Sequence, residues 1–339
     1  MPALTRLSGR PLLDNASDRL LFVGRDEEFR TLQRGIQNNL NCLVLGPPGS
    51  GKTSVLHPLS LDARGRGLAV IRVDGNLATD VRSLVELIRG QLVREPSLPS
   101  EWRAMVTALA DTRPASELER LADVLGSLAP SDQQLALRRP LIVLDNVPSA
   151  EIGHTLFGRL RDELWTLPFT WLVAADERFR LTFLAPPADA FFEIVVTLGP
   201  LSVQAIADLL GRRIDDPSLG WLIEEVSRSS DRQPGAAIRL ARNAIASDKQ
   251  PHEITAERAA FEAKLDQLGP SARALVQQLE QFGPMSASDE NLLNRLHWSR
   301  VRANQVFREL EAAGMVTSTL QAVDAAGRPR KIYGLENRL

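Results

Sequence analysis

Several features that mark whole classes of protein are scarce or missing in this sequence. Cys42 is the single cysteine among 339 residues, so no disulfide can form within the chain, which fits a reducing cytoplasm. No apolar run approaches the length of a membrane span, and Met1–Asp18 contains no apolar stretch of signal-peptide length. We therefore expect a cytoplasmic chain without a membrane partner.

The sequence also lacks a large net charge of one sign and the residue spacings typical of metal sites. The formal net charge is -2, so any contact with nucleic acid must come from a local basic patch and not from the charge of the whole chain. His57, His154 and His252 are isolated and lack the spacing of a metal site. A chain of 339 residues is too long for one small core, which predicts two or three domains.

What the sequence does contain is an alternation of apolar and helical segments up to about residue 200. Short, continuous apolar runs are typical of parallel strands buried on both faces, and helices between them predict an α/β sheet. The expected strands are Leu40–Leu45, Leu68–Val73, Leu141–Asp145, Phe169–Ala174 and Glu193–Leu198. The expected helices are Arg25–Gln37, a helix beginning at Thr53, Leu77–Leu92, Glu101–Ala129 and Leu156–Trp165.

A phosphate-binding loop stands between the first strand and the helix after it. Gly46–Thr53 reads Gly-Pro-Pro-Gly-Ser-Gly-Lys-Thr and matches G-x-x-x-x-G-K-S/T in the expected strand–loop–helix context. Gly49 and Gly51 should adopt positive φ so that backbone N–H groups face the phosphates. Lys52 should reach the β- and γ-phosphates, and the Thr53 hydroxyl should ligate Mg²⁺. ATP and Mg²⁺ are the expected cofactors, with Gly46, Pro47, Pro48, Gly49, Ser50, Gly51, Lys52, Thr53 and Ser54 as the contacting residues.

The apolar strand Leu141–Asp145 provides the second half of such a site. Asp145 should hold Mg²⁺, and Asn146 stands where many P-loop ATPases have a glutamate that polarises water. An amide cannot be a general base, so either hydrolysis is slow and the protein works as a switch, or another residue helps. Glu151 and Asp176 are possible substitutes, and a plain turn role for Asn146 stays open.

The strand that ends at Asp176 should bring further charges to the phosphates, because ligands sit at the carboxyl ends of parallel strands. Asp176, Arg178 and Arg180 are candidates for sensing the γ-phosphate, and an arginine could act as a finger on a neighbouring subunit's nucleotide. A solvated charged loop is the alternative. The expected catalytic set is Lys52, Thr53, Asp145, Asn146, Asp176 and Arg178.

Leu21–Glu28, with the sequence LFVGRDEE, resembles the F-x-G-R-x-x-E box of origin-recognition-type AAA+ initiator ATPases and of STAND signalling ATPases. The resemblance implies that Val23, Gly24 and Arg25 help to enclose the adenine. Val196–Ser202 is similar to the junction that opens the helical lid of these families, and Asp231–Gly235 looks like their lid motif, which implies a nucleotide contact by Pro234. The resemblance extends over about Leu20–Ser247, and Asp145-Asn146 looks more like the STAND variant.

After Pro200 the strands stop, and lid helices are expected at Ser202–Gly211, Pro217–Ser227 and Gly235–Ser247, followed by Glu253–Leu268. The last segment predicts three more helices and two short strands, a winged helix-turn-helix. Its helices are expected at Ser271–Gln281, at Ala287–Leu296, and from an N-cap at Ser299 to Ala313. The strands are expected at Met315–Leu320 and Lys331–Leu335, and the string FRELEAAGMV resembles the recognition-helix end of winged-helix regulators.

In such folds the third helix enters the major groove of double-stranded DNA. Ala303, Phe307 and Leu310 should pack inward, and the segment Arg295–Lys331 has seven basic against three acidic residues. The alternative is a packing module that binds no DNA. The expected DNA contacts are Arg300, Arg302, Asn304, Gln305 and Arg308 on the helix, and Arg328, Arg330 and Lys331 on the wing.

These patterns together predict an α/β P-loop parallel-sheet ATPase domain with a helical lid and a C-terminal winged helix-turn-helix domain. The expected divisions are an N-terminal arm at 1–20, the ATPase domain at 21–200, the lid at 201–262 and the winged helix at 263–339. The favoured function is a slowly hydrolysing, ATP-dependent switch that controls DNA binding. The alternative is a STAND-type signalling or defence ATPase whose winged helix mediates assembly into a homo-oligomer or binds a separate effector protein, and does not bind DNA. A small-molecule P-loop kinase is disfavoured because no acceptor-binding set is evident.

Overall fold

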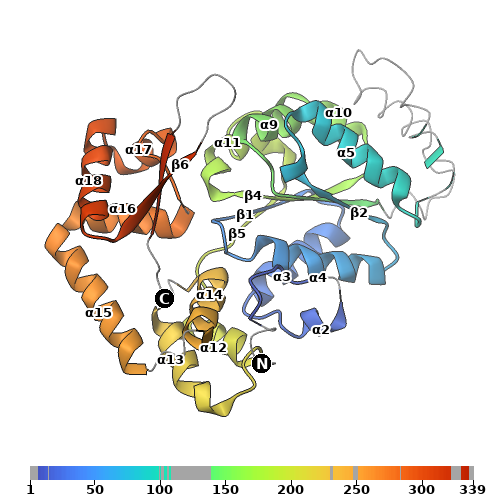
Figure 1. Ribbon diagram of the computed structural model, residues 1–339. Coiled ribbons are helices and arrows are strands. Elements are labelled where there is room, and N and C mark those ends of the chain that lie inside the picture. Colours follow the sequence, from blue (N-terminus) through green and yellow to red (C-terminus); the bar gives the residue numbers. More distant parts are fainter. Residues whose placement is uncertain are drawn as a thin grey trace. The chain divides into compact units, whose positions relative to one another are not determined.

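The computed structural model describes residues 7–13, 15–98, 100, 103–104, 107, 139–229, 232–246, 251–282, 284–321 and 330–335 (Figure 1). The chain divides into two compact units, one of Arg10–Leu201 and one of Met1–Gly9 with Ser202–Leu339. Most of the predicted helical segment Glu101–Ala129 lies outside the described residues. None of the described helices combines the length and the hydropathy that crossing a bilayer requires.

A five-stranded parallel sheet forms the centre of the first unit. Its strands follow the spatial order β2 (Val70–Asp74), β3 (Leu141–Asp145), β4 (Thr170–Asp176), β1 (Cys42–Gly46) and β5 (Ile194–Thr197). The expected parallel-sheet α/β fold is confirmed, and each strand lies within two residues of its predicted bounds. The loops that follow β1, β3 and β4 all emerge at the same edge of the sheet, because parallel strands share their direction.

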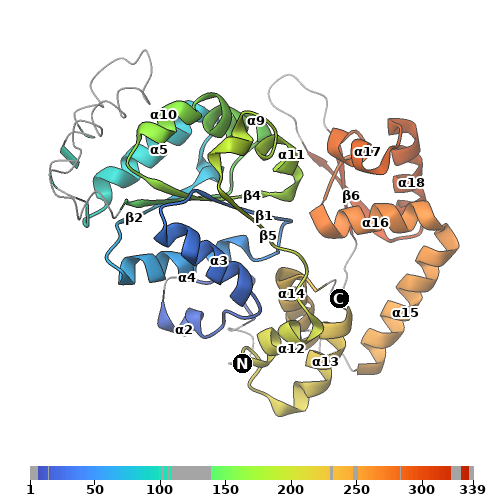
Figure 2. The ribbon, with the colours of Figure 1, turned by 180° about the vertical axis from the view of Figure 1, so that it is seen from behind.

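Helices cover both faces of this sheet (Figures 1 and 2). On one face lie α3 (Asp26–Gln37) and α4 (Lys52–Gly65), whose buried residues pack with Cys42 and Val44 of β1. On the other face α5 (Val81–Arg94) packs with Leu43 and Leu45. This alternation along β1 explains why all its side chains are buried and why its sequence is continuously apolar.

The segment expected as one helix over Leu156–Trp165 is broken into three pieces. It begins earlier, at α9 (Ala150–His154), where the Ser149 side chain caps Ile152 N, then forms a π-helical turn, η3 (Thr155–Arg159), and ends in α10 (Arg161–Thr166). Three consecutive residues of the turn, Leu156 to Gly158, are buried. A regular surface helix would turn one of them toward solvent, so the π turn serves a large aromatic cluster in which Phe157 contacts Trp171.

Shorter pieces complete the first unit. They are α2 (Ala16–Arg19) within the expected N-terminal arm, η1 (Gly75–Leu77) after β2, and η4 (Glu177–Phe179), α11 (Arg180–Phe183) and η5 (Ala188–Phe191) between β4 and β5. Of these, η1 and η4 lie at the carboxyl edge of the sheet, because they start directly after Asp74 of β2 and Asp176 of β4 respectively.

The second unit is helical up to a terminal hairpin. Its helices are α12 (Val203–Gly211), the short η6 (Pro217–Leu219), α13 (Gly220–Ser229), α14 (Pro234–Ala246), α15 (Pro251–Leu268), α16 (Pro270–Phe282), α17 (Glu290–Leu296) and α18 (Arg300–Ala312). The hairpin pairs β6 (Val316–Gln321) with β7 (Arg330–Leu335) in antiparallel fashion. The predicted division at 262/263 falls inside the continuous helix α15, because the heptad-like apolar positions Phe261, Leu265 and Leu268 join one cluster with α16 and α18.

Gly75 shows how tightly the ends of β2 and β3 pack, since a Cβ there would lie 2.4 Å from the carbonyl oxygen of Asn146 and 3.1 Å from that of Asp145. Backbone oxygens cannot move aside like the end of a side chain. We predict that Gly75→Ala lowers the free energy of unfolding by about 1–3 kcal/mol through overpacking, measured by chemical denaturation. Gly90, inside α5, has no atom within 4 Å of such a Cβ, so the matched Gly90→Ala should raise stability by about 0.5–1 kcal/mol. Equal effects of the two substitutions would contradict the close approach.

Candidate functional site

The loop between β1 and α4 has the backbone of a phosphate cradle. Gly49 and Gly51 adopt φ of 80° and 95°, the left-handed region expected for them from the sequence. Gly51 is also the residue before the first turn of α4, so the positive end of that helix faces the loop. At Gly46 a Cβ would lie 2.6 Å from Ser50 Oγ and 3.2 Å from Leu198 Cβ. A side chain at this position would therefore require the Ser50 hydroxyl and Leu198 to shift.

Lys52 lies within this loop, and its ammonium is turned onto the loop's own carbonyls. Its Nζ donates to the oxygens of Gly46 at 2.7 Å and Pro47 at 3.1 Å. Burial lowers the pKa of Lys52, while the charges of Asp176, Asp145 and Glu177 raise it and that of Arg178 lowers it. The carboxyl ends of β3 and β4 thus deliver opposite charge to the ammonium. A phosphate bound in the cradle would offer Lys52 stronger acceptors than neutral carbonyls.

Asp145, the last residue of β3, is buried and only partly satisfied. It is 6% exposed, Thr53 hydrogen bonds to it, and its Oδ1 has no hydrogen-bond partner. Burial raises the pKa of Asp145, against the lowering effects of the Thr53 hydrogen bond and the charge of Arg72. A buried carboxylate with an open oxygen beside a hydroxyl is the donor set that Mg²⁺ prefers. Thr53 and Asp145 therefore fit the ion that the phosphate loop implies.

The backbone conformation of Asn146 and a side-chain contact with the end of β2 both account for an asparagine at this position. Its φ is 56°, a left-handed conformation that asparagine tolerates better than other residues with a side chain. Its Nδ2 donates to Asp74 Oδ1 at 3.1 Å, toward the end of β2. This arrangement favours the turn role for Asn146 over a part in polarising water.

Two ion pairs, Asp176–Arg178 and Glu177–Arg180, lie at and just after the end of β4, next to the phosphate loop. Asp176 lies directly beside Gly46 in the sheet register. Its Oδ1 accepts from the backbone N of Arg178 at 2.9 Å, and its Oδ2 pairs with the Arg178 guanidinium at 3.0 Å. Arg180 pairs with Glu177 at 3.2 Å and donates to Thr197 Oγ1 at 2.8 Å. Sequence reasoning missed Glu177, although its place directly after the strand end was the signal that singled out Asp176.

The box that precedes the loop is tied to it through Arg25. Gly24 has a φ of 73°, and Arg25 is 5% exposed. The Arg25 guanidinium pairs with Glu28 at 2.9 Å and donates to the carbonyl oxygens of Ser50 and Gly199. The Arg25 side chain thus contacts the backbone of the phosphate loop. Adenine contacts by Val23, Gly24 and Arg25 stay a prediction.

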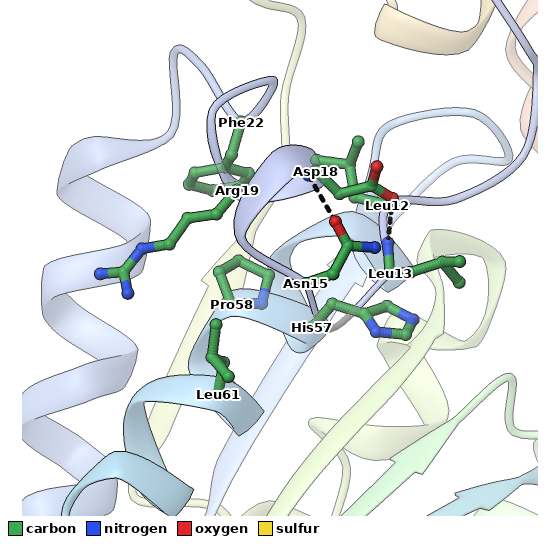
Figure 3. A pocket seen from close by; sticks show the side chains of 9 residues that line it. All are labelled: Leu12, Leu13, Asn15, Asp18, Arg19, Phe22, His57, Pro58 and Leu61. Atoms are coloured by element: carbon green, nitrogen blue, oxygen red, sulfur yellow. Dashed lines mark hydrogen bonds between the residues drawn. The ribbon is translucent and has the colours of Figure 1, made fainter. Parts of the chain in front are cut away.

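A small pocket lies between α4 and the segment predicted as an N-terminal arm (Figure 3). Asp18 shapes this segment, since its carboxylate pairs with Arg10 at 2.5 Å and accepts from Leu13 N at 2.6 Å. Leu12 N approaches the Ser54 hydroxyl at 3.5 Å, so the segment reaches the first turn of the loop's helix. The pocket is lined by Leu12, Leu13, Asn15, Asp18, Arg19, Phe22, His57, Pro58 and Leu61.

The remaining predicted residues lie in the second unit. Pro234 begins α14, while Asp231 lies outside the described residues. On α18 the predicted inward residues Ala303, Phe307 and Leu310 are buried, and Ser299 caps the helix through Arg302 N. Arg300, Arg302, Gln305 and Arg308 are exposed and Asn304 is half-buried; Arg328 and the Arg330 side chain lie outside the described residues. Lys331 pairs with Glu311 at 2.8 Å.

Comparison with known proteins agrees with this geometry. The family model of the AAA ATPase domain matches residues 21–184, which lie within the segment 21–200 expected to form the ATPase domain. The chain is 30% identical over 160 residues to an immunity-related GTPase family Q protein of Mus musculus, a match over 45% of this chain and only 25% of that protein. The chain therefore spans about a quarter of the length of that relative.

Two solved structures share the fold. A Cdc6p structure from Pyrobaculum aerophilum is 15% identical, with a TM-score of 0.50 over 98% of this chain and 93% of that one. A Walker-type ATPase of Pyrococcus abyssi is 15% identical, with a TM-score of 0.51 over 97% of both chains. At such identity the likeness concerns the fold alone.

The buried Asp145 carboxylate should cost stability in the absence of bound cations. Because burial raises its pKa in the folded chain above the unfolded value, the cost is present above the folded pKa and disappears as the pH falls through it. We predict that Asp145→Asn raises the free energy of unfolding at pH 7 by about 0.5–2 kcal/mol, and that the gain shrinks toward about pH 4. Chemical denaturation at both pH values measures this. The control is Asp162→Asn, an exposed carboxylate paired with Arg161; a gain equal at both pH values would rule out the desolvation argument.

Proposed function

We propose that the chain binds ATP with Mg²⁺ at Gly46–Thr53 and works as a slowly hydrolysing switch whose nucleotide state controls binding of double-stranded DNA. The observation that carries the nucleotide part is the open oxygen of buried Asp145 beside the Thr53 hydroxyl, at the edge where Lys52 lies. A buried carboxylate with an unpaired oxygen is costly unless a cation or donor completes it. Bound Mg²⁺ would supply that charge and would neutralise the phosphates.

The residues take separate roles in this proposal. Loop N–H groups and the N-terminus of α4 hold the phosphates, and Lys52 exchanges the Gly46 and Pro47 carbonyls for phosphate oxygens. Asp176 and Arg178 lie close enough to Lys52 to affect its pKa, which supports a role in sensing the γ-phosphate. Val23, Gly24, Arg25 and Pro234 are proposed on the adenine side.

Slow hydrolysis is supported by the state of Asn146. Its amide donates to Asp74 and cannot accept a proton from water. A bound triphosphate would then persist and keep the chain in the conformation that binds ATP better, which is what a switch requires.

DNA binding is proposed for α16, α17, α18 and the hairpin, which we interpret as a winged helix. Support comes from the packing of α18, whose buried side includes Phe307 stacked on Tyr333 of β7 at 4.2 Å between ring centroids. This fixes the opposite side, with exposed Arg300, Arg302 and Arg308, toward solvent. Arginines on such a face suit guanine edges and phosphates.

The nucleotide proposal predicts that Lys52→Ala weakens ATP binding by about 10–100-fold, since a charge-assisted hydrogen bond contributes about 1.5–3 kcal/mol. Calorimetric titration with ATP and Mg²⁺ measures it, with GTP titrated in parallel because the mouse relative is named a GTPase. Lys264→Ala, an exposed lysine on α15, is the control and should bind normally. Unchanged affinity in Lys52→Ala would overturn the proposal, and tighter binding of GTP would reassign the base.

The DNA proposal predicts that the triple variant Arg300→Ala, Arg302→Ala, Arg308→Ala binds duplex DNA more weakly and with a flatter salt dependence. Each lost phosphate contact should reduce the slope of log K against log salt by about 0.9. Fluorescence anisotropy on a mixed-sequence duplex, with and without ATP, measures both. The charge-matched control removes Arg30, Arg82 and Arg228, which are exposed on other helices. Equal binding by the two triple variants would argue against a DNA-reading α18.

A STAND-type switch is the second candidate, favoured by apolar exposure on the same elements. Val301 of α18 and Leu320 of β6 are 79% and 75% exposed. Arg302 already donates to Ser271 Oγ at 2.8 Å, and Gln305 donates to Glu309 at 2.9 Å. A protein surface, either a second copy or a separate effector, would cover the apolar side chains. Salt-insensitive self-association that requires ATP, without DNA binding, would decide for this function.

A further inference from the structure

The candidate site lacks the carboxylate that P-loop hydrolases place after the Mg²⁺-binding aspartate. Asn146 occupies that position, its backbone is left-handed, and its side chain is bound to Asp74. An amide cannot accept a proton from water, and this one is already bound to Asp74. In the proposed mechanism, the proton acceptor for an attacking water is therefore sought at another strand end.

The carboxylates described at this edge differ in how far they are already satisfied. Asp74 accepts from Asn146 Nδ2 at 3.1 Å and from Asn76 N at 3.1 Å. Both oxygens of Asp176 accept from Arg178, one from its backbone and one from its side chain. Both hydrogen bonds of Asp74 go to its Oδ1, but Asp74 ends β2, which β3 and β4 separate from the strand of the phosphate loop. Asp176 has both oxygens occupied, and the open oxygen of Asp145 is the one proposed for Mg²⁺. A general base needs an oxygen that is free to take a proton.

Glu177 offers such an oxygen. Its Oε1 pairs with Arg180 at 3.2 Å, whereas its Oε2 is buried and has no hydrogen-bond partner. Arg180 also donates to Thr197 Oγ1 at 2.8 Å, so one guanidinium anchors the carboxylate to the end of β5. Glu177 directly follows Asp176, the register partner of Gly46 at the start of the phosphate loop.

Charge places Glu177 near the reacting groups as well. Its carboxylate is among the groups that raise the pKa of Lys52, together with Asp176 and Asp145. The sheet order explains this proximity, since β4 lies between β1, which carries the phosphate loop, and β3, which carries Asp145.

We propose that Glu177 is the general base for ATP hydrolysis in this chain, an inference that rests on the proposed function. Glu177 Oε2 accepts a proton from a water molecule as the water oxygen forms its bond to the γ-phosphorus. The bond from the γ-phosphorus to the β–γ bridging oxygen breaks, and its electron pair leaves with ADP. Hydrogen phosphate is released, and the proton passes from Glu177 to solvent. Arg180 is the positioning residue that holds the carboxylate.

The test is the isosteric Glu177→Gln, whose amide oxygen still accepts from Arg180. We expect hydrolysis to fall by about 100-fold or more, the contribution of a positioned base, while calorimetric ATP affinity stays within about threefold. The fall in rate that wild type shows on acidification should be lost in the residual activity of Glu177→Gln. Glu177→Asp, which keeps a carboxylate, should retain measurable hydrolysis and that acid limb.

Glu163→Gln is the matched control. Glu163 also has a buried carboxylate oxygen without a partner, but it lies on α10, which leads into the opposite end of β4. It should hydrolyse ATP like wild type. Wild-type hydrolysis in Glu177→Gln would overturn the inference, as would loss of hydrolysis in Glu151→Gln alone or a wild type that binds ATP without hydrolysing it. In each case, ATP binding measured by calorimetry leaves the nucleotide-binding part of the proposed function standing, whereas failure of wild type to bind ATP overturns the proposed function itself.

Discussion

The buried ammonium of Lys52 needs carboxylates close to it, and the arrangement of the first unit supplies them. Burial and the charge of Arg178 lower the pKa of Lys52, and the charges of Asp176, Asp145 and Glu177 oppose that effect. Those charges arrive from β3 and β4, strands separated from β1 by long crossovers in the sequence. A parallel sheet with β4 between β1 and β3 is what brings their carboxyl ends together. The apolar faces of α3, α4 and α5 cover the two faces of this sheet.

How much of the fold could be predicted from the sequence depends on whether a feature is set by neighbouring residues or by residues far apart in the chain. The strands and the phosphate loop follow from local pattern, because burial on both faces leaves a continuous apolar run and a left-handed loop leaves glycines such as Gly49 and Gly51. The π turn at Thr155–Arg159 could not be found this way. It depends on Phe157 meeting Trp171, Phe183, Phe191 and Phe192, and only the folded chain places these rings together.

The site shows the same division. Lys52, Thr53 and Asp145 carry recognisable motifs, and the structure brings them together. Glu177 carries no motif, since a glutamate after a strand is ordinary in sequence. What distinguishes Glu177 is that its Oε2 is buried and has no hydrogen-bond partner. Its other oxygen, Oε1, is paired with Arg180, which also donates to Thr197. The turn role of Asn146 is likewise favoured only by its φ and by its contact with Asp74, neither of which the sequence shows.

Arg25 connects the phosphate loop to the chain that leads out of the first unit. Its buried guanidinium donates both to Ser50 O within the loop and to Gly199 O, three residues before the second unit begins at Ser202. Gly46 packs against Leu198 on the same path, and Leu198 N donates to Leu45 O at 2.7 Å. A ligand can shift a conformational equilibrium only through contacts that differ between the two states. Arg25 provides one guanidinium that holds both the backbone of Ser50 in the loop and the backbone of Gly199 near the end of the first unit. In this structure, the box Leu21–Glu28 thus ties the phosphate loop to the segment that follows β5, and its contact with adenine stays a proposal.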